Sequence, residues 1–220
     1  MGDSKNKMAQ IVPAILEHTK EAFLQKLSLV SKIPGVERIQ VDFGDGEFVA
    51  AKLLSVDEMS NLNPAIHWEA HLMVKAPKDF LDYQICGFKT LIVHYEAYAS
   101  AVDVKQTLAE IKKMGFKAGI AINPETPVKV LVTMEADQYL IMGVVPGKQG
   151  QSFIQGTTDR IAELRKLKPN AIIEVDGGIK MDNVKQVADA GADLIIAGSA
   201  IVGQENPAEA FEKLKQMANQ

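Results

Sequence analysis

IQVDFGDG, residues Ile39–Gly46, is a short apolar run that ends in an aspartate and continues into glycine. IEVDGG, residues Ile173–Gly178, repeats the same pattern much later in the chain. In parallel α/β proteins, catalytic side chains stand at the C-terminal ends of strands, where the backbone turns. Asp42 and Asp176 therefore predict two acid/base groups that converge on one substrate.

Similar β-branched runs recur along the whole chain and alternate with segments of helical periodicity. The predicted strands are Ile11–Leu16, Arg38–Phe43, Trp68–Val74, Thr90–His94, Ala118–Ile122, Tyr139–Val144, Ile172–Val175 and Leu194–Ala197. The predicted helices are Glu21–Val30, Lys78–Ile85, Val102–Met114, Thr157–Leu167, Asp182–Ala190 and Pro207–Met217, with another around Val56–Leu62. Asp182 and Asn206 are the expected N-caps of the last two helices before the C-terminus.

The strand segments are nearly all apolar, which is typical of a parallel sheet covered on both faces. Eight such units in one chain predict an α/β fold, a single (β/α)8 TIM barrel over residues 9–220. Residues 1–8 are expected to form a disordered leader, since they are mostly polar. A doubly wound open sheet is the alternative, although it usually contains fewer strands.

Composition excludes several classes of protein. The chain has 220 residues, of which 47% are hydrophobic, so it is long enough for a full core. No apolar run reaches the roughly 18 residues of a membrane span, and the N-terminus lacks the apolar segment of a signal peptide. The net charge of −4 and the scattered lysines and arginines argue against a nucleic-acid partner. The single cysteine, Cys86, predicts a buried, inert thiol in a reducing, cytoplasmic setting.

Three glycine-bearing turns follow the last three predicted strands. Gly177-Gly178 and Gly198-Ser199 stand where TIM barrels build a phosphate cradle from backbone N–H groups. Gly147, Lys148 and Gly150 lie in the preceding loop, which is flexible enough to act as a lid. Each turn alone is a weak signal, but the three together predict phosphate binding. There is no nucleotide-binding GxGxxG or Walker motif.

His71 lies in the third predicted strand, at the same open end as Asp42 and Asp176. Two carboxylates and an imidazole form a plausible divalent-metal site. They equally suit proton transfer next to a carbonyl. The alternative for His71 alone is a hydrogen-bonded core histidine.

Seven runs in the chain resemble those of the ribulose-phosphate 3-epimerase family, in the same order and at similar spacing. These runs are IQVDFGDGEFV, EAHLMVKAP, HYEA, AINPETPV, LIMGVVPGKQGQSF, IEVDGGI and AGADLIIAGSAI. The resemblance covers about Ile11–Val202 and implies a barrel of the ribulose-phosphate-binding type.

The resemblance implies that ribulose 5-phosphate and xylulose 5-phosphate interconvert through a cis-enediolate, with Asp42 and Asp176 acting on opposite faces of one carbon. It also implies one divalent metal ion, Mg, Mn, Fe or Zn, held by Asp42, His71, Asp176 and a fourth side chain. His71 and Met142 would lie beside the substrate, with Met142 as pocket wall. No partner beyond a small sugar phosphate is implied, and whether the chain forms a homo-oligomer is left open.

More than six positions depart from the family pattern, among them Glu47, Ala50, Ala51 and Gln149 and four that bear on the site. Gln40 replaces the histidine expected as fourth metal ligand, which favours Mg²⁺ or Mn²⁺ over Zn²⁺. Ala14 replaces a serine, Gly44 replaces a methionine and is expected to open space beside the metal, and Lys148 replaces a phenylalanine. Two alternatives follow: an epimerase or isomerase of another ketose phosphate, or a non-catalytic sugar-phosphate-binding barrel whose metal site has decayed.

Overall fold

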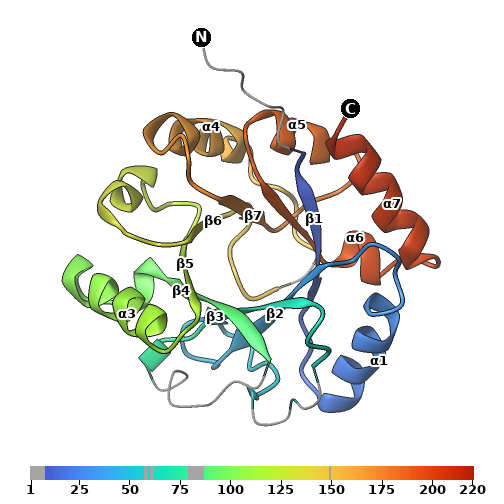
Figure 1. Ribbon diagram of the computed structural model, residues 1–220, viewed down its shortest axis with the longest axis horizontal. Helices are drawn as coiled ribbons and strands as arrows, with labels where there is room; N and C mark the ends of the chain where they lie inside the picture. Colours follow the sequence, from blue (N-terminus) through green and yellow to red (C-terminus); the bar gives the residue numbers. More distant parts are fainter. Residues whose placement is uncertain (1–7, 57–58, 60–61, 79–86, 149) are drawn as a thin grey trace.

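The computed structural model describes residues 8–56, 59, 62–78, 87–148 and 150–220. Eight parallel strands close into a barrel in sequence order, and helices surround it (Figure 1). The strands are β1 (Gln10–Ile15), β2 (Arg38–Gly44), β3 (His67–Met73), β4 (Phe88–His94), β5 (Lys117–Ile122), β6 (Gln138–Met142), β7 (Ile173–Asp176) and β8 (Leu194–Ala197). The predicted TIM barrel is thereby confirmed, and each strand overlaps its predicted segment. Its division into a leader and one domain stays a prediction.

The helices of the described residues are α1 (Lys20–Val30), α3 (Ala101–Lys113), α4 (Thr157–Leu167), α5 (Val184–Asp189), α6 (Ser199–Val202) and α7 (Pro207–Ala218). Two 3₁₀ helices join them, η2 (Tyr95–Ala97) and η3 (Val128–Thr133). η3 stands between β5 and β6, where a regular barrel has an α-helix. No described helix is long and apolar enough to cross a membrane.

One of the two predicted helix caps is confirmed and the other is wrong. Asn206 accepts a hydrogen bond from the Glu209 backbone N–H at 3.2 Å and precedes Pro207. Asp182 does not cap α5, because that helix begins at Val184 after Asn183. Asn183 instead accepts from the backbone N–H of Lys180, which stabilises the turn before the helix.

Other sequence predictions fall on residues outside the description. The predicted helix Lys78–Ile85 lies almost wholly there, as does Cys86. The helix expected around Val56–Leu62 lies partly there.

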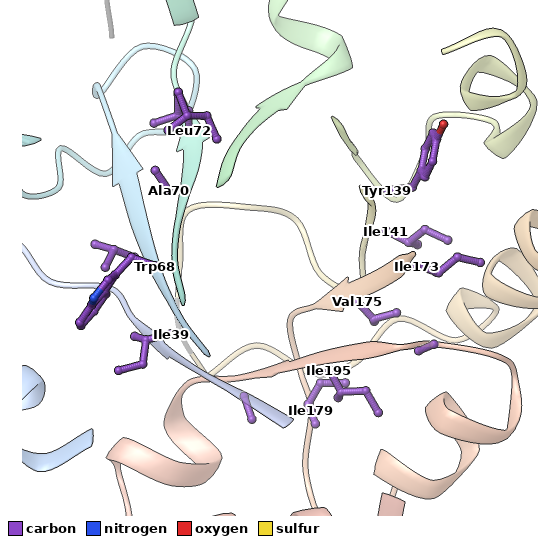
Figure 2. Close-up of a cluster of buried hydrophobic side chains, with 14 of the residues drawn as sticks. Ile39, Trp68, Ala70, Leu72, Tyr139, Ile141, Ile173, Val175, Ile179 and Ile195 are labelled. Carbon is purple, nitrogen blue, oxygen red and sulfur yellow. The ribbon is translucent and has the colours of Figure 1, made fainter. Parts of the chain in front are cut away.

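Side chains alternate between the outside and the inside of the barrel. The outward side chains form the main core between strands and helices (Figure 2). Trp68 from β3, Ile141 from β6 and Val175 from β7 are each fully buried in this layer. Their burial anchors the strands against the helices and leaves the inward positions free for other chemistry.

The inward positions of β2, β3 and β7 are polar, which corrects the expectation of nearly all-apolar strands. Gln40 pairs in register with Glu69, and Asp42 pairs with His71. Gln40, Glu69 and His71 have no exposed surface. Both faces of these three strands are buried as predicted, but their inner face is polar and hydrogen bonds must satisfy it, whereas inward residues of other strands such as Val12, Leu140 and Ile196 are apolar.

Candidate active site and metal centre

A pocket opens at the C-terminal ends of the strands and encloses about 630 Å³, including its open mouth. Asp42 and Asp176 line it, together with Ala14 from β1 and Ile196 from β8. The pocket lies where TIM-barrel enzymes carry out their chemistry. The strand-end aspartates therefore share one cavity, as the sequence predicted.

One ring nitrogen of His71 lies close to both aspartates. Its Nδ1 lies 2.9 Å from Asp42 Oδ1 and 3.4 Å from Asp176 Oδ2. The imidazole is fully buried and does not line the pocket, whereas both carboxylates reach it. His71 thus stands behind the carboxylates, and its expected contact with the substrate stays a prediction.

Gln40 completes this group with its side-chain amide. Its Nε2 donates to Asp42 Oδ1 and to Asp176 Oδ2, each at 2.8 Å, and lies 3.5 Å from His71 Nδ1. We call Gln40, Asp42, His71 and Asp176 the upper cluster. One neutral amide therefore cross-links two carboxylates in the interior of the barrel.

Burial and charge perturb the titration of this cluster. Burial opposes a charged His71, but hydrogen bonds to Asp176 and Asp42 outweigh it and raise the pKa of His71 to about 9. Burial raises the pKa of Asp42, and the charge of Asp176 adds to the effect, while the bond to His71 works against it. Perturbations of this kind are typical of functional sites.

A second histidine, which the sequence analysis did not single out, supports His71. His71 Nε2 lies 2.8 Å from His94 Nε2, and burial lowers the pKa of His94 to about 4. His71 is therefore the donor of this hydrogen bond, and it keeps its Nδ1 toward the carboxylates.

Glu96 orients His94 in turn. His94 Nδ1 lies 3.4 Å from Glu96 Oε2, and the other oxygen of Glu96 accepts from the Asn123 backbone N–H and the Thr126 hydroxyl. Burial disfavours a charged Glu96, but these hydrogen bonds prevail and lower its pKa. The sequence signals for these two residues were the position of His94 at a strand end and the run HYEA, residues 94–97, which resembles the family.

The predicted phosphate-binding residues gather around the same pocket. Those that line it are Met142, Gly147, Lys148, Gly150, Gly177, Gly178, Gly198 and Ser199. Lys180 also lines it and was missed, because it follows the Gly177-Gly178 turn rather than belonging to it. Residue 149, inside the lid loop, lies outside the described residues.

The Gly177-Gly178 turn requires glycine. Gly177 has a φ of 107°, and a Cβ there would lie 2.3 Å from Val144 Cγ2. Gly178 has a φ of 71°, and its Cβ would lie 2.6 Å from the Phe153 backbone. Neither the backbone conformation nor the space admits a side chain, so both positions of this turn are restricted to glycine.

Gly44 does not open space beside the carboxylates, contrary to the prediction. A Cβ at Gly44 would lie 2.7 Å from the Ala51 carbonyl oxygen and 3.0 Å from a Val49 methyl group. The loop after β2 has folded onto this position, and Leu53 donates its backbone N–H to the Gly44 carbonyl at 2.9 Å. The glycine therefore permits a close backbone approach.

The donor atoms of the upper cluster fit a divalent cation. Asp42, His71 and Asp176 each offer one ligand atom, and these atoms lie within 4.8 Å of one another. Carboxylate and imidazole donors suit Mg, Mn, Fe and Zn to different degrees. Gln40 turns its Nε2 toward the two carboxylates, while its Oε1 is buried and has no hydrogen-bond partner in the part of the chain that is described.

The sequence profile of the Ribulose-phosphate 3 epimerase family matches residues 10–202. The chain is 32% identical over 218 residues to a ribulose-phosphate 3-epimerase of Bacillus subtilis, covering 94% of this chain and 99% of that protein. It is 36% identical over 216 residues to a ribulose-phosphate 3-epimerase of Synechocystis, covering 94% and 93%. A chloroplastic ribulose-5-phosphate-3-epimerase of Arabidopsis thaliana is 34% identical over 214 residues, covering 93% and 75%.

Solved structures with the same barrel are more distant in sequence. 3-Hexulose-6-phosphate synthase from Salmonella typhimurium superposes with a TM-score of 0.71 at 20% identity, covering 95% of this chain and 98% of that chain. Orotidine 5'-phosphate decarboxylase from Pyrococcus horikoshii superposes with a TM-score of 0.67 at 18% identity, covering 96% and 100%. At such identity the likeness concerns the fold alone.

Proposed function

Because the chain belongs to the ribulose-phosphate 3-epimerase family, we propose that it interconverts ribulose 5-phosphate and xylulose 5-phosphate. One observation carries the proposal: Asp42 from β2 and Asp176 from β7 line the same pocket and hold the same amide nitrogen at 2.8 Å. Two carboxylates that reach one point from different strands of the barrel suit a reaction on two faces of a single carbon.

The two aspartates would exchange protons at C3 of the sugar. One carboxylate removes the C3 proton, and the electron pair moves into the adjacent carbonyl to give a planar enediolate. The other carboxyl group returns a proton to the opposite face, so that the configuration at C3 inverts and no proton is gained or lost overall. Asp42 and Asp176 exchange these roles in the reverse direction.

Asp42, His71 and Asp176 would hold one divalent cation, with Gln40 as a fourth ligand. When bound, such a cation supplies Lewis-acid stabilisation of the negative charge that develops on the substrate oxygens. His94 and Glu96 would act through His71, because their hydrogen bonds orient its imidazole.

The substrate phosphate would lie at the turns Gly177-Gly178 and Gly198-Ser199. Both turns line the pocket that Asp42 and Asp176 share, and the first has no room for a side chain. Lys148 and Lys180 add positive charge to the same pocket. Binding the phosphate there would place the sugar carbons over the carboxylates. The cytoplasmic location stays a prediction.

Solvent deuterium exchange tests this function directly. The purified protein is incubated in D₂O with ribulose 5-phosphate and with Mg²⁺, Mn²⁺, Fe²⁺ or Zn²⁺ in turn. We expect deuterium at C3 together with xylulose 5-phosphate as product. If no added metal yields exchange or product, the proposal is wrong and a non-catalytic sugar-phosphate-binding barrel becomes the better account.

A second candidate is an epimerase or isomerase of another ketose phosphate. Ala14 lines the pocket where the family pattern has a serine, and Lys148 lines it where the pattern has a phenylalanine. Both changes alter contacts to the sugar without touching the carboxylates. The same exchange assay across several ketose phosphates separates the candidates, because the preferred substrate will show the highest kcat/KM.

A further inference from the structure

We propose that Gln40 is a two-state ligand, whose amide NH₂ cross-links Asp42 and Asp176 without metal and whose Oε1 turns to coordinate a divalent cation when one binds. The inference rests on the metal site of the proposed function, but it concerns a residue by which this chain departs from its family pattern.

The metal-free arrangement satisfies the carboxylates with hydrogen atoms. Gln40 Nε2 donates to Asp42 Oδ1 and Asp176 Oδ2 at 2.8 Å each, which uses both of its N–H groups. The opposite orientation would aim a carbonyl oxygen at two carboxylates. Without a cation, electrostatics therefore hold the NH₂ group toward the aspartates.

A cation reverses this preference. Coordination requires lone pairs, and the NH₂ group of an amide has none to offer, whereas the amide oxygen binds hard cations. Nε2 lies at 2.8 Å from two donor atoms of the site and at 3.5 Å from His71 Nδ1. Turning the amide by half a rotation puts Oε1 in that position and makes it the fourth donor.

The oxygen that would turn is not held in place. Gln40 Oε1 is buried and has no hydrogen-bond partner within the described residues. An unsatisfied buried acceptor is costly and needs an explanation. A ligand that is used in only one of two states provides that explanation.

A second glutamine in the same barrel shows the opposite situation. Gln138 Nε2 donates to Glu69 Oε1 at 2.9 Å and to Glu174 Oε2 at 2.8 Å, and so also bridges two carboxyl groups. Its oxygen, however, accepts from Arg38 Nη1 at 3.4 Å. Gln138 is thus fixed at both ends of its amide, which makes it a matched control for Gln40.

Calorimetric titration of the EDTA-treated protein with Mn²⁺ tests the role of the oxygen. In Gln40→Met, which keeps the size and loses the amide, we expect about tenfold weaker Mn²⁺ binding, because one ligand is lost. In Gln40→Glu, we expect about tenfold tighter binding, because an anionic oxygen replaces a neutral one and no amide turn is needed. Wild-type affinity in Gln40→Met would overturn the inference.

Thermal unfolding tests the role of the NH₂ group. Without metal, Gln40→Glu should melt at a lower temperature than the wild type, since three carboxylates then face one another. With saturating Mn²⁺, the order should be reversed. Gln138→Glu should instead melt lower in both conditions and leave Mn²⁺ affinity unchanged. If Gln40→Glu does not fold without metal, Gln40→Met still decides the question through its affinity.

The turn itself is visible by NMR. In ¹⁵N spectra, the side-chain NH₂ pair that disappears in Gln40→Met is assigned to Gln40. Without metal, that pair should be shifted and protected from solvent exchange by its two carboxylate acceptors. Diamagnetic Zn²⁺ or Mg²⁺ should move the chemical shifts of the pair, because the NH₂ group loses both carboxylate acceptors, and unchanged shifts at saturation would contradict the proposal.

These readouts do not involve the sugar. A protein that binds Mn²⁺ through Gln40 and exchanges no deuterium would contradict the proposed function and leave this inference standing. An active epimerase whose Mn²⁺ affinity is unchanged in Gln40→Met would support the proposed function and contradict this inference.

Discussion

Inside the barrel, two glutamine amides each bridge a pair of acidic side chains. The two clusters formed in this way differ in where their positive charge comes from. In the upper cluster, Gln40 joins Asp42 to Asp176 beside the pocket. In the lower cluster (Arg38, Glu69, Gln138 and Glu174), Gln138 joins Glu69 to Glu174 near the N-terminal ends of the strands.

The lower cluster carries its own permanent cation. Arg38 makes a short ion pair with Glu69, whose side chain is fully buried. Burial, and next to it the negative charge of Glu69, raise the pKa of Glu174 well above its usual value. Arg38 therefore supplies this cluster with a positive charge from within the chain.

The upper cluster has no arginine or lysine among its members. Its positive charge comes from a protonated His71 or from an exchangeable cation. A cluster that is open to the pocket and balanced by an exchangeable charge can do chemistry, whereas a closed and permanently balanced one holds strands together. The predictions below test that contrast.

The largest effect is expected on activity, from Asp176→Asn. Removing one member of an acid/base pair typically costs 10²–10⁴-fold in rate, and we expect deuterium exchange at C3 to fall by about that factor. The matched control is Glu174→Gln, two residues earlier on β7. It replaces a buried carboxyl group that does not line the pocket by an amide of the same size, so exchange should stay near the wild-type rate. Equal losses of exchange in both variants would contradict the assignment of catalysis to the upper cluster alone.

The largest effect on stability is expected from Arg38→Met. This change leaves the buried Glu69 without its cation and should cost about 3–5 kcal/mol in the free energy of unfolding, measured by urea denaturation. Mn²⁺ should not restore the loss. Lys185→Met, which breaks an exposed pair with Asp189, is the control and should cost less than about 0.5 kcal/mol. A loss of that small size in Arg38→Met would contradict the role assigned to Arg38.

The third prediction concerns pH and the upper cluster. The pKa of His71 is about 9 in the folded protein, above its ordinary value of 6.5, so its protonation stabilises the fold fully below pH 6.5. The metal-free protein should lose up to about 3 kcal/mol of unfolding free energy as the pH rises from 6.5 through 9. Saturating Mg²⁺ should abolish this slope, because the cation then takes the proton's place. A metal-free protein with flat stability over this range would argue against the prediction.

The smallest effect is expected from His67, on the same strand as His71 but beside the lower cluster. Burial and the charges of Arg38, Lys117 and Lys89 lower the pKa of His67 to about 4. The unfolded chain then binds a proton at His67 more readily than the folded protein does. The free energy of unfolding therefore falls as the pH drops from 6.5 to 4. For this half-buried ring the loss should be on the order of 1 kcal/mol. His67→Asn should lack it, and metal should leave it unchanged.

Much of the fold was predictable because it depends on local patterns. Apolar β-branched runs separated by amphipathic segments predicted all eight strands, and Asn206 followed by Pro207 predicted the start of α7. The cap at Asp182 was wrong, since an Asn183 side chain one residue later fits the preceding turn better. The η3 helix was missed because a 3₁₀ segment has no long-range periodicity of its own.

The candidate site was predictable only in part. Asp42, His71 and Asp176 could be placed at one end of the barrel from their strand positions alone. The roles of His94 and Lys180 were missed, because a strand-end position and the HYEA run do not say that His94 contacts His71, and Lys180 stands outside the Gly177-Gly178 turn. Gly44 was misread for the same reason, since the loop that covers it belongs to later residues.

The sequence by itself determined the barrel, the family and the residues at the strand ends, since these follow from residue order and strand periodicity. Only the tertiary structure decided how the inward side chains share charge. In the structure, the Nε2 of Gln40 lies between Asp42 and Asp176, and its Oε1 has no hydrogen-bond partner within the described residues. Arg38 pairs with Glu69 in the lower cluster. The physical reason is that electrostatic interactions depend on distances between atoms of different strands, and barrel closure sets those distances.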